Sequence, residues 1–418
     1  MKKISFFILM VFSTFFLANA QKKENTKGKY DSYKGLVMCG YQGWFSTPDD
    51  GSNRGWGHLG QRNVFKSGNC NIDLWPDVSE YEKTYPTGFK MSDSTVANIF
   101  SSRDESTVDL HFKWMKQYGI DGAFMQRFVG ELKQENGINH FNRVLDLAMN
   151  SAKKYDRAIS MMYDLSGMKP GDEQILLADM DKLAQKYDLF KRKEFPTYLY
   201  HNKKPLVTIW GVGFNDHRAY GLKEAEIIVN TLKLKGFSVM LGVPTYWREF
   251  GNDTNQDSAL HSLIKKCDII LPWFVGRYTE YTTPGFKTYT EFKDLIPKDI
   301  EWCKQNKVDY VPLVYPGFSW KNMKGANTLQ IPRNKGSFFW SQIASCVNYG
   351  SEMLYVAMFD EMDEGTAIFK CTNNVPVGES KFCGFEGMPS DYYLWLTGQA
   401  AEMLKKRQKI PVELPVRK

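Results

Sequence analysis

The chain has 418 residues, of which 43% are hydrophobic and 24% are charged, and its formal net charge is +7. This composition is ordinary for a globular protein. The basic residues are dispersed and form no long run, which argues against nucleic acid as a partner.

The first 20 residues have the pattern of a cleaved signal peptide. Lys2 and Lys3 precede an apolar segment at 4–17, and Ala18-Asn19-Ala20 matches a small-residue cleavage site. No cysteine follows that site to carry a lipid anchor, and no later segment is apolar for long enough to cross a bilayer. The sequence therefore predicts a secreted or periplasmic protein without a membrane anchor. Its expected parts are a signal peptide at 1–20, a flexible polar linker at 21–34 and one catalytic domain at 35–418.

Beyond the linker, short apolar runs alternate with segments of helical period. Eight runs have the length and composition of strands: 36–39, 120–125, 158–163, 205–210, 237–241, 267–273, 310–315 and 353–359. Helical segments are expected at 107–118, 138–154, 173–190, 223–235, 254–266, 291–307, 337–349 and 391–408. This alternation predicts an α/β fold, a single (β/α)8 TIM barrel with a long first βα loop at 40–101. A doubly wound open sheet is the main alternative, but no glycine-rich phosphate-binding motif follows any strand.

Aromatic, amide and charged side chains follow the predicted strands, where a barrel places its active site. Rings can stack on sugar faces, while arginine, glutamine and carboxylates can bind sugar hydroxyls. The candidate substrate-binding residues are Tyr41, Trp44, Gln126, Arg127, Asp164, Trp210, Tyr246, Trp273, Arg277 and Tyr315. Each has a structural alternative: the rings could pack at the rim, the arginines could form salt bridges, and Asp164 could cap a helix.

The last predicted strand ends in four acidic residues out of five, Asp360 to Glu364, followed by Gly365. Glu361 and Glu364 are three apart, and both side chains can reach one cleft if Gly365 allows a tight turn. Two carboxylates in a partly apolar cleft suit acid/base chemistry at an acetal. Because no Ser-His-Asp arrangement or activated cysteine falls on the same rim, glycoside cleavage by this pair is the predicted reaction.

The cysteines and histidines add little chemistry. Cys371 and Cys383 flank a loop and are the best candidates for a disulfide in an exported protein. The six histidines show no metal-ligand spacing, so the sequence predicts neither a metal site nor a cofactor.

Several of these motifs resemble glycoside hydrolase family 99, the endo-α-mannosidase and endo-α-mannanase family, and more loosely family 71. The most specific match is the segment 359–366, F-D-E-M-D-E-G-T, which is similar to the family's F-N-E-W-H-E-G-T. Supporting matches are Gly40-Tyr41-Gln42-Gly43-Trp44-Phe45, His111-Phe112-Lys113-Trp114-Met115, Lys204-Pro205-Leu206, Pro316-Gly317-Phe318 and Arg333.

The resemblance implies a barrel enzyme that cleaves α-mannan-like glycans internally, with retention and without a metal. It implies that Glu361 deprotonates the sugar 2-hydroxyl and that Glu364 protonates the leaving oxygen. The chain departs from the family at Asp360, Met362 and Asp363, and these changes leave the sugar and linkage open. We expect a monomer that acts on an oligo- or polysaccharide; a non-catalytic glycan-binding barrel, or a hydrolase of α-glucan, is the alternative.

Overall fold

The eight predicted runs form the parallel strands of one sheet. The structure, a computed structural model, describes residues 28–417, so the predicted signal peptide and residues 21–27 lie outside the described part. The strands are buried along nearly their whole length because helices cover one side of the sheet and side chains fill the other. They are β1 (Val37–Tyr41), β4 (Gly122–Phe128), β5 (Ala158–Asp164), β7 (Lys204–Trp210), β8 (Ser238–Val243), β9 (Ile269–Pro272), β12 (Asp309–Tyr310) with β13 (Leu313–Val314), and β16 (Leu354–Val356).

The sheet closes into a barrel through its seventh strand, which has two parts. Parallel pairs run in chain order from β1 to β9, and β16 pairs with β1. β12 pairs with β9 at Asp309 and Ile269, whereas β13 pairs with β16 at Leu313 and Tyr355. Pro312 lies between the two parts and has no amide hydrogen to donate, which explains the interruption. The prediction of a (β/α)8 barrel is confirmed.

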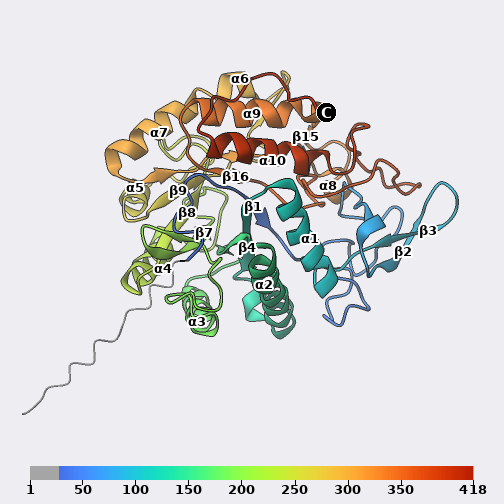
Figure 1. Cartoon of the computed structure of the whole chain (residues 1–418), viewed down its shortest axis with the longest axis horizontal. Coiled ribbons are helices and arrows are strands. Elements are labelled where there is room, and N and C mark those ends of the chain that lie inside the picture. The colour runs from blue at the N-terminus through green and yellow to red at the C-terminus, as the bar shows by residue number, and fades with distance from the viewer. Residues whose placement is uncertain (1–27, 418) are drawn as a thin grey trace, which may run out of the picture.

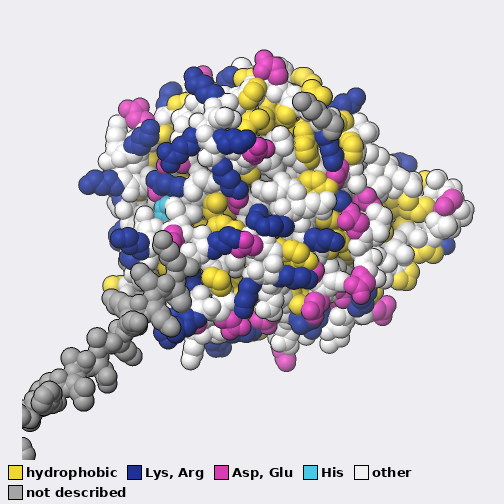
Figure 2. Space-filling view, viewed as in Figure 1, with side chains coloured by type: hydrophobic (Ala, Val, Ile, Leu, Met, Phe, Trp, Pro, Cys, Tyr) yellow, Lys and Arg dark blue, Asp and Glu magenta, His cyan; other side chains and the backbone are white. Residues whose placement is uncertain are grey.

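Amphipathic helices surround the strands, with α1 to α4 on one side of the view and α7, α9 and α10 on the other (Figure 1). Gly119 ends α1 in the left-handed conformation (φ 78°), and its amide donates to the last turn. The helices are α1 (Glu105–Tyr118), α2 (Glu135–Tyr155), α3 (Glu173–Lys186), α4 (Leu222–Leu234), α5 (Ala259–Ile264), α6 (Tyr289–Phe292), α7 (Leu295–Asn306), α8 (Lys321–Lys324), α9 (Ser337–Asn348) and α10 (Tyr392–Lys405). Basic side chains are scattered among acidic ones over the visible face (Figure 2).

The long first loop folds into a lobe with its own aromatic core. Phe65 stacks on Trp75 with ring centroids 5.8 Å apart and contacts Phe89 at 4.8 Å, while Trp75 meets Phe382 at 5.2 Å. The hairpin of this lobe projects from the barrel (Figure 1). The remaining short strands are β2 (Tyr85–Lys90), β3 (Val96–Ile99), β6 (Tyr200–His201), β10 (Tyr278–Thr279), β11 (Lys287–Thr288), β14 (Phe318–Ser319) and β15 (Gln330–Ile331).

Two predictions outside the barrel are wrong. The described end of the expected linker is packed: Tyr33 is fully buried, and its hydroxyl donates to the Leu354 carbonyl at 2.7 Å. The expected disulfide is absent, since both thiols are free. Cys371 and Cys383 form backbone bridges to different residues of one segment, Pro76 and Leu74, which anchors the two cysteines separately.

Candidate active site

The acidic segment after β16 folds into a tight loop at the carboxyl end of the barrel. Thr366 and Ala367 both donate backbone amides to the Glu361 carbonyl, at 3.1 and 2.9 Å. Gly365 takes a left-handed conformation (φ 64°), and a side chain there would start 3.1 Å from the backbone nitrogen of Ser319. Only glycine fits this turn without strain, and the turn brings Glu361 and Glu364 to the same end of the strand.

Asp360 holds the acidic loop to the end of β1. It is fully buried, and its two carboxylate oxygens accept the backbone amides of Gln42 at 2.8 Å and Gly43 at 2.9 Å. Burial raises its pKa to about 7 despite these hydrogen bonds. Because both oxygens already have backbone partners, Asp360 positions the loop and is not available to a substrate.

Glu361 is 3% exposed and is held by two side chains. Gln42 Nε2 donates to its Oε1 at 2.5 Å, and Thr366 Oγ1 donates to its Oε2 at 2.7 Å. Burial raises the pKa of Glu361 well above its usual value, and the nearby charges of Glu364 and Asp363 raise it further. The two donors oppose this rise, so they favour the ionised form and fix the orientation of the carboxylate.

Glu364 is the more accessible of the two glutamates, being only partly buried. Burial raises its pKa to about 7, and the charge of Asp363 adds to the rise, while the Trp320 side chain partly opposes it. Asp164 also raises the pKa of Glu364, which places that predicted residue within electrostatic reach of the acid. A carboxyl group with this pKa can hold a proton near neutral pH and then release it.

Asp363 lies between the two glutamates and meets a residue of the first loop. Its Oδ2 is 3.2 Å from Nδ1 of His58, and its Oδ1 is buried without a hydrogen-bond partner. The His58 ring stacks on Trp44 with centroids 3.8 Å apart and planes within 6°. Trp44 also stacks on Phe128 with centroids 5.1 Å apart, so this predicted stacking platform already contacts two protein rings.

Several predicted residues line the barrel interior beside the acids. The Tyr355 ring lies 6.2 Å from the Trp273 ring. Burial raises the pKa of Tyr355 and the charge of Glu361 raises it further, which places these groups together. Trp273 forms an edge contact with Trp210 at 5.1 Å. Gln126 donates to Met162 Sδ at 3.3 Å, and its side-chain oxygen is buried without a partner.

Three predicted substrate contacts are instead parts of the barrel wall. Arg127 is 1% exposed and makes a two-pronged contact with Asp179 of α3, through Nε at 2.7 Å and Nη2 at 2.6 Å. Tyr41 is fully buried, with its hydroxyl 2.8 Å from His111 Nδ1. Tyr315 is also fully buried and donates to the Tyr278 carbonyl at 2.8 Å. Their contacts in the structure are those of the structural alternative.

Asp164 organises the turn after β5, and its charge acts on Glu364. Its carboxylate accepts the backbone amide of Ser166 at 2.6 Å, as expected for a residue that organises the turn after a strand. Burial raises its pKa, while the hydrogen bonds from Ser166 and, to a lesser extent, the charge of Arg218 partly offset the rise.

Tyr246 and Arg277 line a separate open pocket of about 670 Å³ on the loops that follow β7, β8 and β9. Arg277 Nε lies 2.9 Å from Asp253 Oδ2, and the Arg277 side chain is 37% exposed. Lys287 Nζ lies 5.7 Å from the centre of the Tyr246 ring. The pocket therefore combines an aromatic ring with amide and charged groups on the same end of the barrel as the acids.

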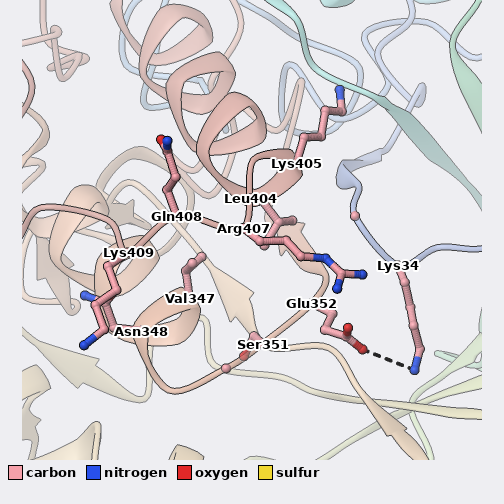
Figure 3. Close-up of a pocket in the computed structure, with 12 residues that line it drawn as sticks. Lys34, Val347, Asn348, Ser351, Glu352, Leu404, Lys405, Arg407, Gln408 and Lys409 are labelled. Carbon is pink, nitrogen blue, oxygen red and sulfur yellow. Dashed lines mark ion pairs between the residues drawn. The ribbon is translucent and has the colours of Figure 1, made fainter.

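Another hollow, of about 410 Å³, lies at the opposite end of the barrel between the starts of β1 and β16 and the end of α10 (Figure 3). Its lining includes the basic side chains Lys34, Lys405, Arg407 and Lys409, and Lys34 pairs with Glu352 at 3.3 Å. Because Lys34 and Glu352 precede their strands, this hollow is remote from the acidic loop.

Four residues of the site were not among the predicted candidates: Gln42, His58, Trp320 and Thr366. Gln42 and Thr366 stand within the quoted motifs, so their position beside the acids was available as a signal. Within residues 28–417, no group of three or more His, Cys, Asp or Glu side chains is placed to hold a metal ion, and no helix is long and apolar enough to cross a membrane.

Comparison with known proteins extends over nearly the whole described chain. The sequence model described as "Glycosyl hydrolase family 99" matches residues 33–406. The glycoprotein endo-alpha-1,2-mannosidase of Rattus norvegicus is 22% identical over 393 residues, covering 89% of this chain and 76% of the relative. The Mus musculus protein of the same name is 22% identical over 395 residues, covering 88% and 74%.

Solved structures share the fold. The GH99 endo-alpha-mannosidase from Bacteroides thetaiotaomicron aligns with a TM-score of 0.62 at 15% identity, covering 90% of this chain and 99% of that one. A glycoside hydrolase-like protein aligns with a TM-score of 0.51 at 12% identity, covering 83% and 96%. At these identities the likeness is one of fold.

Proposed function

The chain belongs to glycosyl hydrolase family 99 and is a glycoside hydrolase, and we propose that it cleaves α-linked, mannan-like glycans at internal bonds with Glu361 and Glu364 as the catalytic pair. The observation that carries the proposal is the meeting of both glutamates in one acidic loop at the carboxyl end of the barrel, with different exposure and with raised pKa values. This is where barrel enzymes hold their reacting groups.

The environments of the two acids support different roles. Glu361 is buried and accepts two hydrogen bonds that favour its ionised form, which suits a base. Glu364 is partly exposed, with a pKa of about 7, which suits an acid that protonates a leaving oxygen and exchanges its proton with solvent.

In the proposed reaction, Glu361 takes the proton of the sugar 2-hydroxyl while that oxygen attacks the anomeric carbon. The bond to the leaving oxygen breaks, and Glu364 donates its proton to that oxygen. Water, deprotonated by Glu364, then opens the 1,2-anhydro intermediate at the anomeric carbon, and Glu361 returns its proton to the 2-oxygen. Two inversions at one carbon give net retention.

Buried polar atoms without protein partners provide further support for a hydroxyl-rich ligand. They include Oε1 of Gln42, Oε1 of Gln126, Nε1 of Trp210 and Oδ1 of Asp363, all on side chains around the acids. An unpaired buried polar group costs about 1–3 kcal/mol, so each of these atoms is expected to gain a hydrogen-bond partner when water or substrate fills the site. The pocket at Tyr246 and Arg277 offers room for sugars further along the chain, as internal cleavage requires.

The experiment is a screen of the purified chain against α-mannan and α-glucan oligosaccharides, with the anomer of the first product followed by proton NMR. We expect internal cleavage of α-mannan with α product formed first. Cleavage of α-glucan instead would contradict the proposed substrate, and β product formed first would contradict retention. Binding without turnover of any of these glycans would favour the non-catalytic alternative.

We further propose that the protein is exported and acts as a monomer. The pattern at residues 1–20 supports export. Cell fractionation with N-terminal sequencing tests it: a mature protein that begins near Gln21 is expected outside the cytoplasm, and an intact Met1 in the cytoplasm contradicts export. Light scattering of that mature protein should give the mass of one chain.

A further inference from the structure

Asp363, the acidic residue between Glu361 and Glu364 in the chain, is the carboxylate of this loop whose charge most needs a balancing group. Asp363 is 2% exposed and shares its short loop with Asp360, Glu361 and Glu364. Like charges at such close range raise one another's pKa, and the charge of Asp363 contributes to the raised pKa of both glutamates. The proton affinity of the catalytic pair therefore depends on how far the charge of Asp363 is balanced.

His58 is placed to provide that balance. Its Nδ1 is 3.2 Å from Asp363 Oδ2, and its ring is fixed by stacking on Trp44 at 3.8 Å. The backbone of His58 is in the left-handed region (φ 60°), an uncommon conformation for a non-glycine residue, so the loop is shaped to present this ring. The side chain is 34% exposed, so the ring lies at the edge of the acidic loop and is not enclosed in the barrel interior.

We propose that His58 is a positioning residue that orients Asp363 and, when it carries a proton, balances the charge of Asp363, so that Glu364 can donate its proton at neutral pH. The proposal rests on the assignment of Glu364 as the acid and deepens it. It gives the first loop a role in the chemistry that its sequence did not suggest.

Other charged groups lie around the pair. The charge of Asp164 also raises the pKa of Glu364, less than burial and Asp363 do, and the charge of Asp363 adds to the rise that burial gives the pKa of Asp360. On the side of the first loop and α2, Glu131 is paired with Arg54 at 2.6 Å. Arg54 lowers the pKa of Glu131 against the effect of burial, and His58 and His140 contribute less. On the other side, Asp363 faces the carboxylates of its own loop. His58 is thus a basic group between two acidic sites, and its contact is with Asp363.

The test compares the pH dependence of kcat/KM for the full-length protein and the variants His58→Gln, Asp363→Asn and the double variant. Glutamine keeps a hydrogen-bond donor but cannot carry charge, so in His58→Gln the charge of Asp363 is unbalanced. The pKa of Glu364 in this variant then rises, so Glu364 stays protonated to higher pH. The alkaline limb of the kcat/KM profile should therefore move up by about 1 pH unit. Asp363→Asn removes the charge and should move the alkaline limb down by a similar amount.

The double variant separates the proposal from general damage to the site. Because His58 is proposed to act through Asp363, the double variant should behave like Asp363→Asn alone. The proposal is overturned if the alkaline limb of the kcat/KM profile moves in the same direction in both single variants. It is also overturned if that limb stays in place and only the value of kcat/KM falls. Melting temperatures identify variants that fold poorly, and His58→Asn serves as a second neutral replacement in that case.

A measurement that does not depend on glycan hydrolysis tests this inference separately from the proposed function. Titration of the glutamate carboxyls by infrared difference spectroscopy should show the same opposite shifts in the two single variants. If the wild-type chain hydrolyses no glycan in the screen, the proposed function fails, yet the spectroscopic shifts still decide whether His58 acts on the loop. Equal carboxyl titration in wild type and His58→Gln would contradict the inference directly.

Discussion

Removing the side chain of Gln42 should weaken catalysis without unfolding the barrel. Gln42 Nε2 donates to Glu361 Oε1 at 2.5 Å, while the backbone amide of Gln42 is held independently by Asp360. Gln42→Ala therefore deletes one hydrogen bond to a carboxylate and leaves the loop anchored. Hydrogen bonds to charged groups contribute about 1.5–3 kcal/mol, which corresponds to roughly a 10- to 100-fold fall in kcat/KM if the bond is needed in the transition state.

The pH dependence of kcat/KM in Gln42→Ala gives a second test of this reasoning. The Gln42 hydrogen bond lowers the pKa of Glu361, so its loss raises that pKa further. Because Glu361 must be ionised to act as a base, the acidic limb of the kcat/KM profile should move to higher pH. Gln305→Ala is a matched control, since Gln305 donates to Glu301 at 3.3 Å on the surface of α7. An unmoved acidic limb with kcat/KM within twofold of wild type would refute this reasoning.

Three further predictions concern the frame of the barrel. Arg127→Met should lower the free energy of unfolding in urea by about 3–5 kcal/mol, because it leaves a carboxylate of α3 without its buried partner; a loss under 1 kcal/mol contradicts the structural role. Because Cys371 and Cys383 are free, a reducing agent should leave the melting temperature unchanged, and a clear drop would reveal a disulfide. Arg417 lowers the pKa of Asp391 to about 2, so the ionised pair stabilises the fold above about pH 4. The difference in unfolding free energy between wild type and Arg417→Ala should therefore shrink as pH falls from about 4 toward about 2. A difference that stays constant over this range contradicts the pairing.

The barrel was predictable because its strands are buried on both sides and read as short apolar runs. In its helices, apolar residues recur with a clear helical period. Even the divided seventh strand appeared as one apolar run, since both parts are buried in the same wall. The packed end of the expected linker was missed because Tyr30 and Tyr33 stand among polar residues, and burial there depends on contacts more than a hundred positions away.

The structure places the predicted rim residues in different surroundings, because position after a strand does not fix the direction of a side chain. Neighbouring strand residues point to opposite sides of a sheet. Gln126 therefore faces the interior beside Met162, whereas Arg127 faces outward to α3. This alternation of side-chain direction along the strand follows from the sequence positions, and it could have distinguished Gln126 from Arg127. His58 left no such signal, because it lies in an irregular loop where no period relates sequence to direction.

The central claim, that Glu361 and Glu364 carry out the reaction in different roles, is tested most directly by their glutamine variants on two substrates. The first is an α-mannan oligosaccharide, and the second is an α-mannosyl fluoride of the same chain length, whose leaving group needs no proton. Glu352→Gln, at the opposite end of the barrel, is the control. The account predicts a loss of at least about 100-fold on the oligosaccharide for both variants. With the fluoride, Glu364→Gln should retain the rapid release of fluoride in the first turnover, because only its second step needs Glu364 as a base, and Glu361→Gln should lose that release. Hydrolysis of the oligosaccharide at the wild-type rate by either variant would contradict it.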